Sequence, residues 1–206
     1  MVFVDVGANL GYLSLVAARA VGAGGKVICF EPNQMNCGLL YISAKANGFE
    51  NIEIHPFAVT DTCKSVIYDD INGNGVISEV GAEFAFLPTR YIAMAVTLDH
   101  ALRDEKQVHV IKMDVEGAEY LVLQGARKLL AAHRPTILSE LSPGGLANVS
   151  KVSDRDYIQM LVGEGYDISV LREDGDVADC GTDVSKALNH VHQRRESHID
   201  IMALPR

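Results

Sequence analysis

The chain has 206 residues, of which 48% are hydrophobic, and carries a formal net charge of −9 at pH 7. This size suits one well-packed domain over residues 1–206, and the negative charge argues against nucleic acid as a partner, because phosphate contacts need a positive surface. The sequence contains no apolar run long enough to cross a membrane, no signal peptide and no C-x-x-C spacing among its cysteines. We therefore expect a cytoplasmic protein with reduced thiols and no membrane partner.

The first residues predict a buried parallel strand, a glycine turn and a helix. Residues 2–6 form a short, largely β-branched run, which Asp5 interrupts near its carboxyl end. Gly7 permits a tight turn and the close approach of a ligand, and Gly11 lets the following helix pack against the strand. An apolar helical pattern over residues 13–20 completes this unit, which is typical of nucleotide-binding α/β sheets.

The composition of the turn bears on the kind of nucleotide. Its spacing is G-x-N-x-G, with Asn9 in place of the middle glycine of the dinucleotide signature G-x-G-x-x-G. Asp5 precedes Gly7 by two residues, and a carboxylate there would repel a pyrophosphate. It suits a ligand with an ammonium and a sulfonium group, and S-adenosylmethionine carries both.

A second acid marks the next predicted strand, which spans residues 26–31 and ends in Glu31. Glu31 lies about twenty residues beyond the glycine turn, where a carboxylate binds the ribose hydroxyls of an adenosine ligand. NAD enzymes and methyltransferases share this feature. Glu31 therefore supports an adenosine cofactor without choosing between the two classes.

The next predicted elements are a helix opened by Pro32 and a third strand over residues 52–59. At the end of this strand, Ala58 and Val59 are well placed to contact an adenine ring. Residues from about 60 to 96 break the strand–helix alternation, and we predict a β-hairpin insertion there.

The predicted hairpin turn also resembles the start of an EF-hand calcium loop. Asp70, Asn72 and Asn74 have the alternate spacing of its first three ligands. However, the twelfth position is Gly81 instead of a bidentate glutamate, and no helices are predicted on either side. We therefore interpret the segment as a plain hairpin and predict no metal site.

Alternation resumes after the insertion, with a strand over residues 108–114, a helix that ends before Pro135, and a strand over 136–141. Acids end four of the predicted parallel strands: Asp5, Glu31, Asp114 and Glu140. Because the ligand crevice of an open doubly wound sheet lies outside the carboxyl ends of its strands, we expect these acids to converge there. For Glu140 we leave open the alternative that it caps the following helix.

Asp114, Glu116 and Glu119 form the densest acidic cluster and are the candidate catalytic residues. If both glutamates are helical, they lie on one face at the helix start, where the macrodipole favours the anion. Methyl transfer depends largely on alignment, but a hydroxyl acceptor also needs a base, and any of the three acids can serve. Coordination of Mg²⁺ by Asp114 is a weaker alternative.

The carboxyl-terminal part predicts a capping box at residues 153–156, then strands at 166–171 and 198–204. We predict no helix between these strands, so they should pair antiparallel. An NAD-type sheet normally stays parallel, whereas a methyltransferase sheet ends with a reversed strand inserted beside its fifth. His190 and His192 lack an acid or cysteine to complete a metal site, and we interpret them as part of a solvated polar stretch.

With these motifs in place, the chain resembles the FkbM family of S-adenosylmethionine-dependent methyltransferases. The resemblance rests on residues 4–11, 30–32, 58–59, 97–99 and 111–119, with Asp61, Gly125 and 203–205. It implies an α/β class I methyltransferase (Rossmann-like) fold: a doubly wound sheet, mostly parallel, with a reversed C-terminal strand and, here, the β-hairpin insertion after strand 3. It further implies S-adenosylmethionine as cofactor and O-methylation of a hydroxyl on a sugar or secondary metabolite. Cofactor contacts carry over to Asp5, Gly7, Asn9, Gly11 and Glu31.

Two other functions remain open from the sequence. One is an NAD-dependent oxidoreductase, which Asn9 and Asp5 disfavour. The other is a non-catalytic cofactor-binding module of a larger protein. The first strand begins at residue 2, and such sheets often carry a substrate-covering segment ahead of it, so we expect one domain of a longer protein or a shortened chain. The expected partner is a small hydroxylated acceptor; the oligomeric state stays open, a homodimer included.

Overall fold

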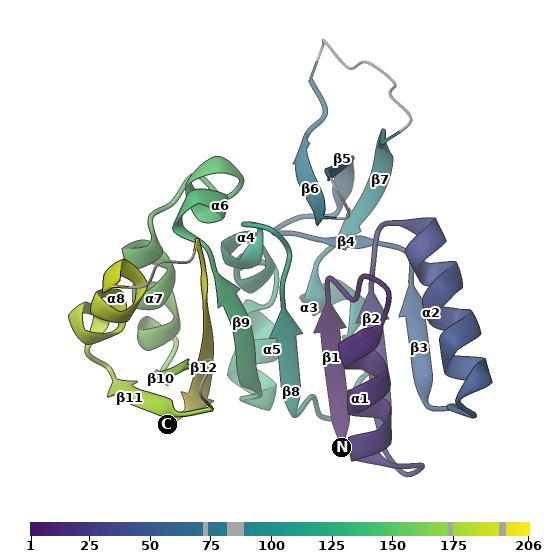
Figure 1. The fold of residues 1–206 in the computed structure, drawn as a ribbon, viewed down its shortest axis with the longest axis horizontal. Coiled ribbons are helices and arrows are strands. Elements are labelled where there is room, and N and C mark those ends of the chain that lie inside the picture. Colours follow the sequence, from purple (N-terminus) through teal and green to yellow (C-terminus); the bar gives the residue numbers. More distant parts are fainter. Residues whose placement is uncertain (72–73, 82–88, 173–174, 194–196) are drawn as a thin grey trace.

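The computed structural model describes residues 1–71, 74–81, 89–172, 175–193 and 197–206. In this described part, eight strands form a large sheet in the order β11-β10-β12-β9-β8-β1-β2-β3, and four form a small sheet in the order β4-β7-β5-β6 (Figure 1). The strands of the large sheet are β1 (Val2–Val6), β2 (Lys26–Phe30), β3 (Ile52–His55), β8 (Val110–Met113), β9 (Thr136–Leu141), β10 (Tyr166–Leu171), β11 (Val177–Gly181) and β12 (Ile199–Pro205). Those of the small sheet are β4 (Ala58–Val59), β5 (Lys64–Ile71), β6 (Asn74–Glu79) and β7 (Arg90–Val96).

Helices pack on both faces of the large sheet. They are α1 (Tyr12–Val21), α2 (Gln34–Ala46), α3 (Leu98–Ala101), α4 (Glu119–Gln124), α5 (Arg127–His133), α6 (Pro143–Asn148), α7 (Asp154–Gly163) and α8 (Val184–Gln193). Helix α1 buries Ala17 and Ala18, and α2 buries Leu40, against β2 on one face, whereas α3, α4, α5, α7 and α8 share the main hydrophobic core on the other. In the described residues, no helix is long and apolar enough to cross a membrane.

Strand β1 is the centre of the sheet. It pairs in parallel with β2 on one side and β8 on the other, so the chain order reverses between these strands. Its β-branched residues explain the strand, because Val4 and Val6 pack in the main core. A reversal of strand order opens a crevice at the carboxyl edge.

Strands β8, β9 and β12 are fully buried on one face only. On the opposite face their alternate residues are at least partly exposed, and no described helix lies over them (Figure 1). The residues on this face are Val110, Lys112, Thr136, Leu138, Glu140 and Met202, which are partly exposed, with Asp200 and Leu204, which are exposed. The open face leaves room for charged side chains near the carboxyl edge of the sheet.

Strand β12 runs antiparallel to both β9 and β10, between which it lies. The prediction of no helix before it was wrong, since β11 and α8 occupy residues 177–181 and 184–193. Helix α8 buries Ala187, Leu188 and Val191 and exposes much of its polar face, which is why its sequence looks like a solvated stretch. His192 lies on this helix and contacts Asp154 at 3.2 Å.

Residues 52–59 do not form the single strand that the sequence predicted. β3 pairs with β2 at the edge of the large sheet, whereas β4 pairs with β7 in the small sheet. Pro56 lies between them, and its missing N–H removes a donor from any continuous ladder. The chain therefore leaves one sheet and enters the other at this point.

The predicted helix after Asp114 is also interrupted. It begins only at α4 and breaks at Gly125, where a Cβ would lie 2.2 Å from the carbonyl oxygen of Thr60. The Gly125 carbonyl accepts the amide of Asp99, and the Asp99 carboxylate accepts two amides near the start of α5 (3.2 and 2.8 Å). A contact from a distant segment thus ends α4 and starts α5. The predicted capping box at Ser153 and Asp156 is confirmed at the start of α7.

The small sheet stands over the carboxyl edge of the large one (Figure 1). β5 pairs antiparallel with both β6 and β7, and residues 72–73 of the EF-hand-like turn lie outside the described part. Its inner face packs on Ala118. Two hydrogen bonds fasten it to the turn before α2: Tyr91 Oη donates to the Pro32 carbonyl (3.2 Å), and Asn33 Nδ2 donates to Asp70 (3.3 Å).

Candidate functional site

The glycine turn after β1 is held by contacts that leave no space for side chains. The amide of Gly7 donates to the carbonyl of Phe30 (3.0 Å), and a Cβ on Gly7 would lie 2.0 Å from the carbonyl oxygen of Asp114. A Cβ on Gly11 would lie 2.0 Å from Leu40 Cδ1, a buried atom of α2. Both glycines have positive φ angles, 76° and 86°. The turn therefore brings bare backbone to the crevice.

Glu31 connects this turn to the start of α2. Its carboxylate accepts the amides of Asn9 and Asn33, each at 2.8 Å, and its residue is 4% exposed. Burial raises the pKa of Glu31, and these backbone hydrogen bonds oppose the rise. Because each carboxylate oxygen has two lone pairs, Glu31 keeps acceptor capacity for the hydroxyls of a ligand.

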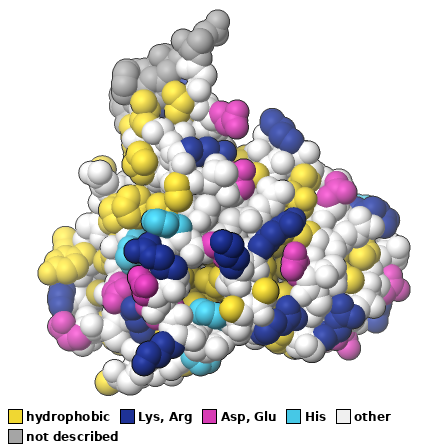
Figure 2. Space-filling view, turned by 180° about the vertical axis from the view of Figure 1, so that it is seen from behind, with side chains coloured by type: hydrophobic (Ala, Val, Ile, Leu, Met, Phe, Trp, Pro, Cys, Tyr) yellow, Lys and Arg dark blue, Asp and Glu magenta, His cyan; other side chains and the backbone are white. Residues whose placement is uncertain are grey.

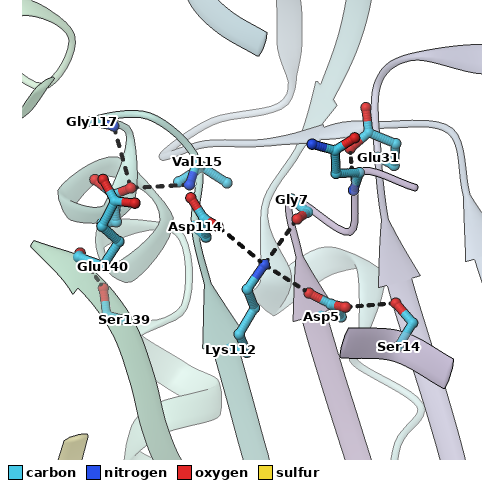
Figure 3. A network of polar contacts seen from close by, with 12 residues as sticks. Asp5, Gly7, Ser14, Glu31, Lys112, Asp114, Val115, Gly117, Ser139 and Glu140 are labelled. Carbon is cyan, nitrogen blue, oxygen red and sulfur yellow. Dashed lines mark hydrogen bonds and ion pairs between the residues drawn. The ribbon is translucent and has the colours of Figure 1, made fainter. Parts of the chain in front are cut away.

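Beneath the turn, Lys112 contacts two groups of the β1 segment, Asp5 and Gly7, and one after β8, Asp114 (Figure 3). Its Nζ atom lies 3.2 Å from Asp5 Oδ1 and 3.7 Å from Asp114 Oδ2, and it donates to the carbonyl of Gly7 (3.0 Å). Asp5 is 0% exposed, and its other oxygen accepts the hydroxyl of Ser14 (2.6 Å). Burial raises the pKa of Asp5, whereas Lys112 and Ser14 act in the opposite direction. A cation and an anion thus occupy the floor of the site together.

Lys112 lies within the segment 111–119 that carries the family resemblance, but it was not predicted as a site residue. The signal that finds it is strand register. Asp5 and Lys112 are directly paired residues of neighbouring parallel strands, so their side chains project from the same face.

A cavity lies between the glycine turn and the inner face of the small sheet. Its walls are Val6, Gly7, Asn9, Phe30, Glu31, Pro32, Asn36, Phe57, Ala58, Val59, Tyr68, Gly75, Ile77, Asp114, Val115, Glu116 and Ala118. The predicted residues brought together here are Gly7, Asn9, Glu31, Ala58, Val59, Asp114 and Glu116. Asp5, Gly11 and Glu119 are not among the lining residues and support the walls from behind.

The loop that carries Glu116 differs from the prediction. Glu116 precedes α4 and has φ 53°, so it does not share a helical face with Glu119. The Glu119 Oε1 atom accepts the amides of Val115 (3.0 Å) and Gly117 (3.2 Å). Burial and the charge of Asp114 raise the pKa of Glu116, and His198, just before β12, lowers it.

Glu140 belongs to a row of acids on neighbouring strands. It pairs with Asp200 of β12 and points toward the loop after β8 (Figure 3). Burial, followed by the charges of Asp114, Glu116, Glu119 and Asp200, raises the pKa of Glu140 to about 8. The alternative that Glu140 caps the next helix is wrong, because Ser142 caps α6. In the described part of the chain, no group of three or more His, Cys, Asp or Glu residues is arranged to hold a metal ion.

The sheet order and the glycine turn after β1 are those of a Rossmann-like α/β fold. The family model of the methyltransferase FkbM domain matches residues 5–168, and the chain therefore belongs to the FkbM methyltransferase family. Comparison with curated proteins gives no sequence match.

Solved structures agree with this fold. Methyltransferase FkbM from Methylobacillus flagellatus superposes with a TM-score of 0.58 at 17% identity, covering 98% of this chain but 42% of that protein. An O-methyltransferase from Thermotoga maritima, described as SAM-dependent, gives 0.51 at 15% identity, covering 99% and 58%. An rRNA methylase from Streptococcus thermophilus gives 0.51 at 12% identity, covering 99% and 86%. The chain thus spans less than half the length of the Methylobacillus protein.

We expect Lys112→Met to lower the free energy of unfolding by about 3 kcal/mol, because Asp5 then stays buried without its cation. The loss should be smaller near pH 4, where Asp5 can take up a proton, and smaller again in Lys112→Met combined with Asp5→Asn. Urea denaturation of the three proteins at two pH values measures it. Lys45→Met removes an exposed ion pair with Glu50 and should change stability little. Equal losses in Lys112→Met and Lys45→Met would contradict the assigned role of Lys112.

Glu140→Gln should change how stability depends on pH. The folded-state pKa of Glu140 is raised from 4.5 to about 8, so the folded protein binds an extra proton between these values and wild-type stability falls as pH rises through them. Removing the carboxyl removes this loss, and the variant should be more stable than wild type at about pH 9 but not at about pH 4. Urea midpoints at both pH values test this. The control is Glu164→Gln, because Glu164 lies away from the acidic row. Parallel pH profiles of stability for wild type and Glu140→Gln would contradict the predicted effect.

Proposed function

We propose that the chain is an S-adenosylmethionine-dependent methyltransferase that methylates a hydroxyl on a small acceptor, a sugar or a secondary metabolite. The observation that carries this proposal is the cavity itself. Its lining combines the Glu31 carboxylate, apolar residues that include Ala58 and Val59, and the carboxylates of Asp114 and Glu116. These three kinds of surface suit the ribose hydroxyls, the adenine ring and the positively charged sulfonium of the ligand.

The lining residues fit the cofactor by chemical type. Glu31 would accept the ribose hydroxyls, and Ala58 and Val59 would pack against the adenine ring. The bare backbone at Gly7 gives the methionine part a close approach, since a Cβ there has no space. Asp5 would affect the cofactor only indirectly, because it holds Lys112, which in turn fixes the glycine turn. When bound, the cofactor supplies an activated methyl group, and the chain supplies alignment.

Charge at the site favours this cofactor over NAD. Asp114 and Glu116 line the cavity beside the turn, whereas a pyrophosphate needs donors and positive charge. Lys112 is already engaged by Asp5 and the Gly7 carbonyl and leaves only a weak contact to Asp114. A sulfonium beside these acids gains favourable electrostatic energy, and a diphosphate loses it.

The acids would also take the acceptor's proton. Glu116 lines the cavity, and its raised pKa makes it a stronger base than an ordinary glutamate. Asp114, which also lines the cavity, is the second candidate. We assign proton acceptance to Glu116 first, because Asp114 already forms an ion pair with Lys112 (3.7 Å).

We further propose that residues 1–206 act as one cytoplasmic methyltransferase domain, in which the small sheet is an insertion that covers the cofactor and β12 is the reversed strand of the class I sheet. A small acceptor fits this domain better than RNA. Figure 2 shows acidic side chains interspersed among the lysines and arginines on the face seen from behind, whereas RNA binding needs a positive surface.

Calorimetry tests the cofactor assignment. We expect S-adenosylhomocysteine to bind and NAD not to bind. Glu31→Ala should weaken S-adenosylhomocysteine binding by about 1–3 kcal/mol through lost hydrogen bonds. The control Glu53→Ala removes an exposed carboxylate on β3 and should leave the affinity unchanged. Heat with NAD alone, or an unchanged affinity in Glu31→Ala, would reject the assignment.

Methyl transfer tests the reaction. The chain is incubated with methyl-labelled S-adenosylmethionine and a panel of sugars, hydroxylated metabolites, amines and a structured RNA, and products are analysed by mass spectrometry. We expect label on a hydroxyl oxygen of a small acceptor. Label on RNA or on nitrogen would redirect the acceptor assignment. Tight cofactor binding without transfer would favour the non-catalytic module.

A further inference from the structure

Glu119 is the least exposed acid in the Asp114–Glu119 segment. It is the first residue of α4, is 1% exposed and does not line the cavity. Its Oε1 atom accepts two backbone amides of the preceding loop, those of Val115 and Gly117. A side chain in this position is bonded to the loop that bears Glu116, and not to solvent or to the cavity.

The loop needs such support, because Glu116 adopts a backbone conformation that glutamate rarely takes. Its φ of 53° lies in the left-handed region, which disfavours residues with a Cβ. Conformations of this kind persist only where the surroundings determine them, and they are frequent at functional sites. The result here is that the Glu116 residue forms part of the cavity wall.

The other side of the loop is fixed by the segment after β9. Gly117 has φ 100°, and a Cβ there would lie 2.2 Å from the carbonyl carbon of Gly145 in α6. The Gly117 carbonyl accepts the hydroxyl of the buried Ser150 (2.5 Å). The loop is therefore clamped between α6 and Glu119, and Glu119 is the part of the clamp that holds amide donors on both sides of Glu116.

From these contacts we infer that Glu119 is a positioning residue: it fixes the amides of Val115 and Gly117 and thereby holds Glu116 at the cavity wall. This inference rests on the proposed function, in which Glu116 takes the acceptor's proton. It reassigns Glu119 from its sequence-predicted role as a base. A base must reach the acceptor, whereas the Glu119 Oε1 atom is engaged by two amides and its residue lies behind the wall.

Two substitutions separate positioning from proton transfer. In Glu119→Gln, the side-chain oxygen still accepts both amides but no longer takes up a proton. In Glu119→Ala, both amide contacts are lost. Glu105→Ala is the matched control, since it removes a partly buried carboxylate that pairs with Lys26, on a segment outside the cavity.

Amide hydrogen exchange by NMR reads the loop directly and needs neither cofactor nor acceptor. We expect exchange at Val115 and Gly117 to rise about tenfold in Glu119→Ala, as one lost hydrogen bond allows, and to stay near wild type in Glu119→Gln and Glu105→Ala. Unchanged exchange in Glu119→Ala would overturn the inference. Because the exchange measurement needs no ligand, its result is valid even if S-adenosylhomocysteine does not bind.

Transfer to the acceptor found in the panel gives the second readout. Glu119→Ala should lower kcat at least about tenfold with little change in acceptor KM, and Glu119→Gln should restore kcat to near wild type with the same pH profile. Loss of transfer in Glu119→Gln with normal amide exchange would make Glu119 the base and overturn the inference. Should Glu119→Ala not fold, Glu119→Gln alone decides between the two roles.

Discussion

The contact between Lys112 and Asp5 is the interaction on which the site depends. Asp5 is completely buried, and a buried carboxylate is stable only with a cation and hydrogen bonds around it. Lys112 and Ser14 supply these from β8 and α1. Because Lys112 also binds the Gly7 carbonyl, the same cation that stabilises Asp5 fixes the glycine turn relative to β8. The neutralisation of Asp5 and the position of the Gly7 backbone therefore both depend on Lys112.

At the other walls of the cavity, too, single carboxylates hold the backbone in place while they form or support the wall. Glu31 both accepts the amides that shape two turns and presents a carboxylate to the cavity. Behind the opposite wall, Glu119 orders the loop that carries Glu116. Asp5, Glu31 and Glu119 thus have backbone or charged partners that hold them in place. This arrangement explains how several carboxylates can lie near one another without disrupting the fold.

The parts of the fold that sequence could predict are those set by neighbouring residues. The first strand, its glycine turn and the capping box at Ser153 depend on local propensity and spacing. Prediction failed where distant segments decide the backbone. Gly145 approaches Gly117 and keeps Glu116 out of a helix, and Thr60 approaches Gly125 and breaks the helix there. Lys112 escaped notice because its partner, Asp5, belongs to a strand more than a hundred residues earlier.

The division of residues 52–59 between two sheets has a mechanical consequence. β4 follows β3 after only two residues, and it pairs with β7, to which β5 is joined in turn. Ala58 and Val59 thus line the cavity and also join the small sheet through their pairing with β7. A displacement of those strands would be transmitted along the ladder to the wall itself. A substitution in β5 or β7 that shifts the small sheet should therefore also alter the shape of the cavity wall at Ala58 and Val59.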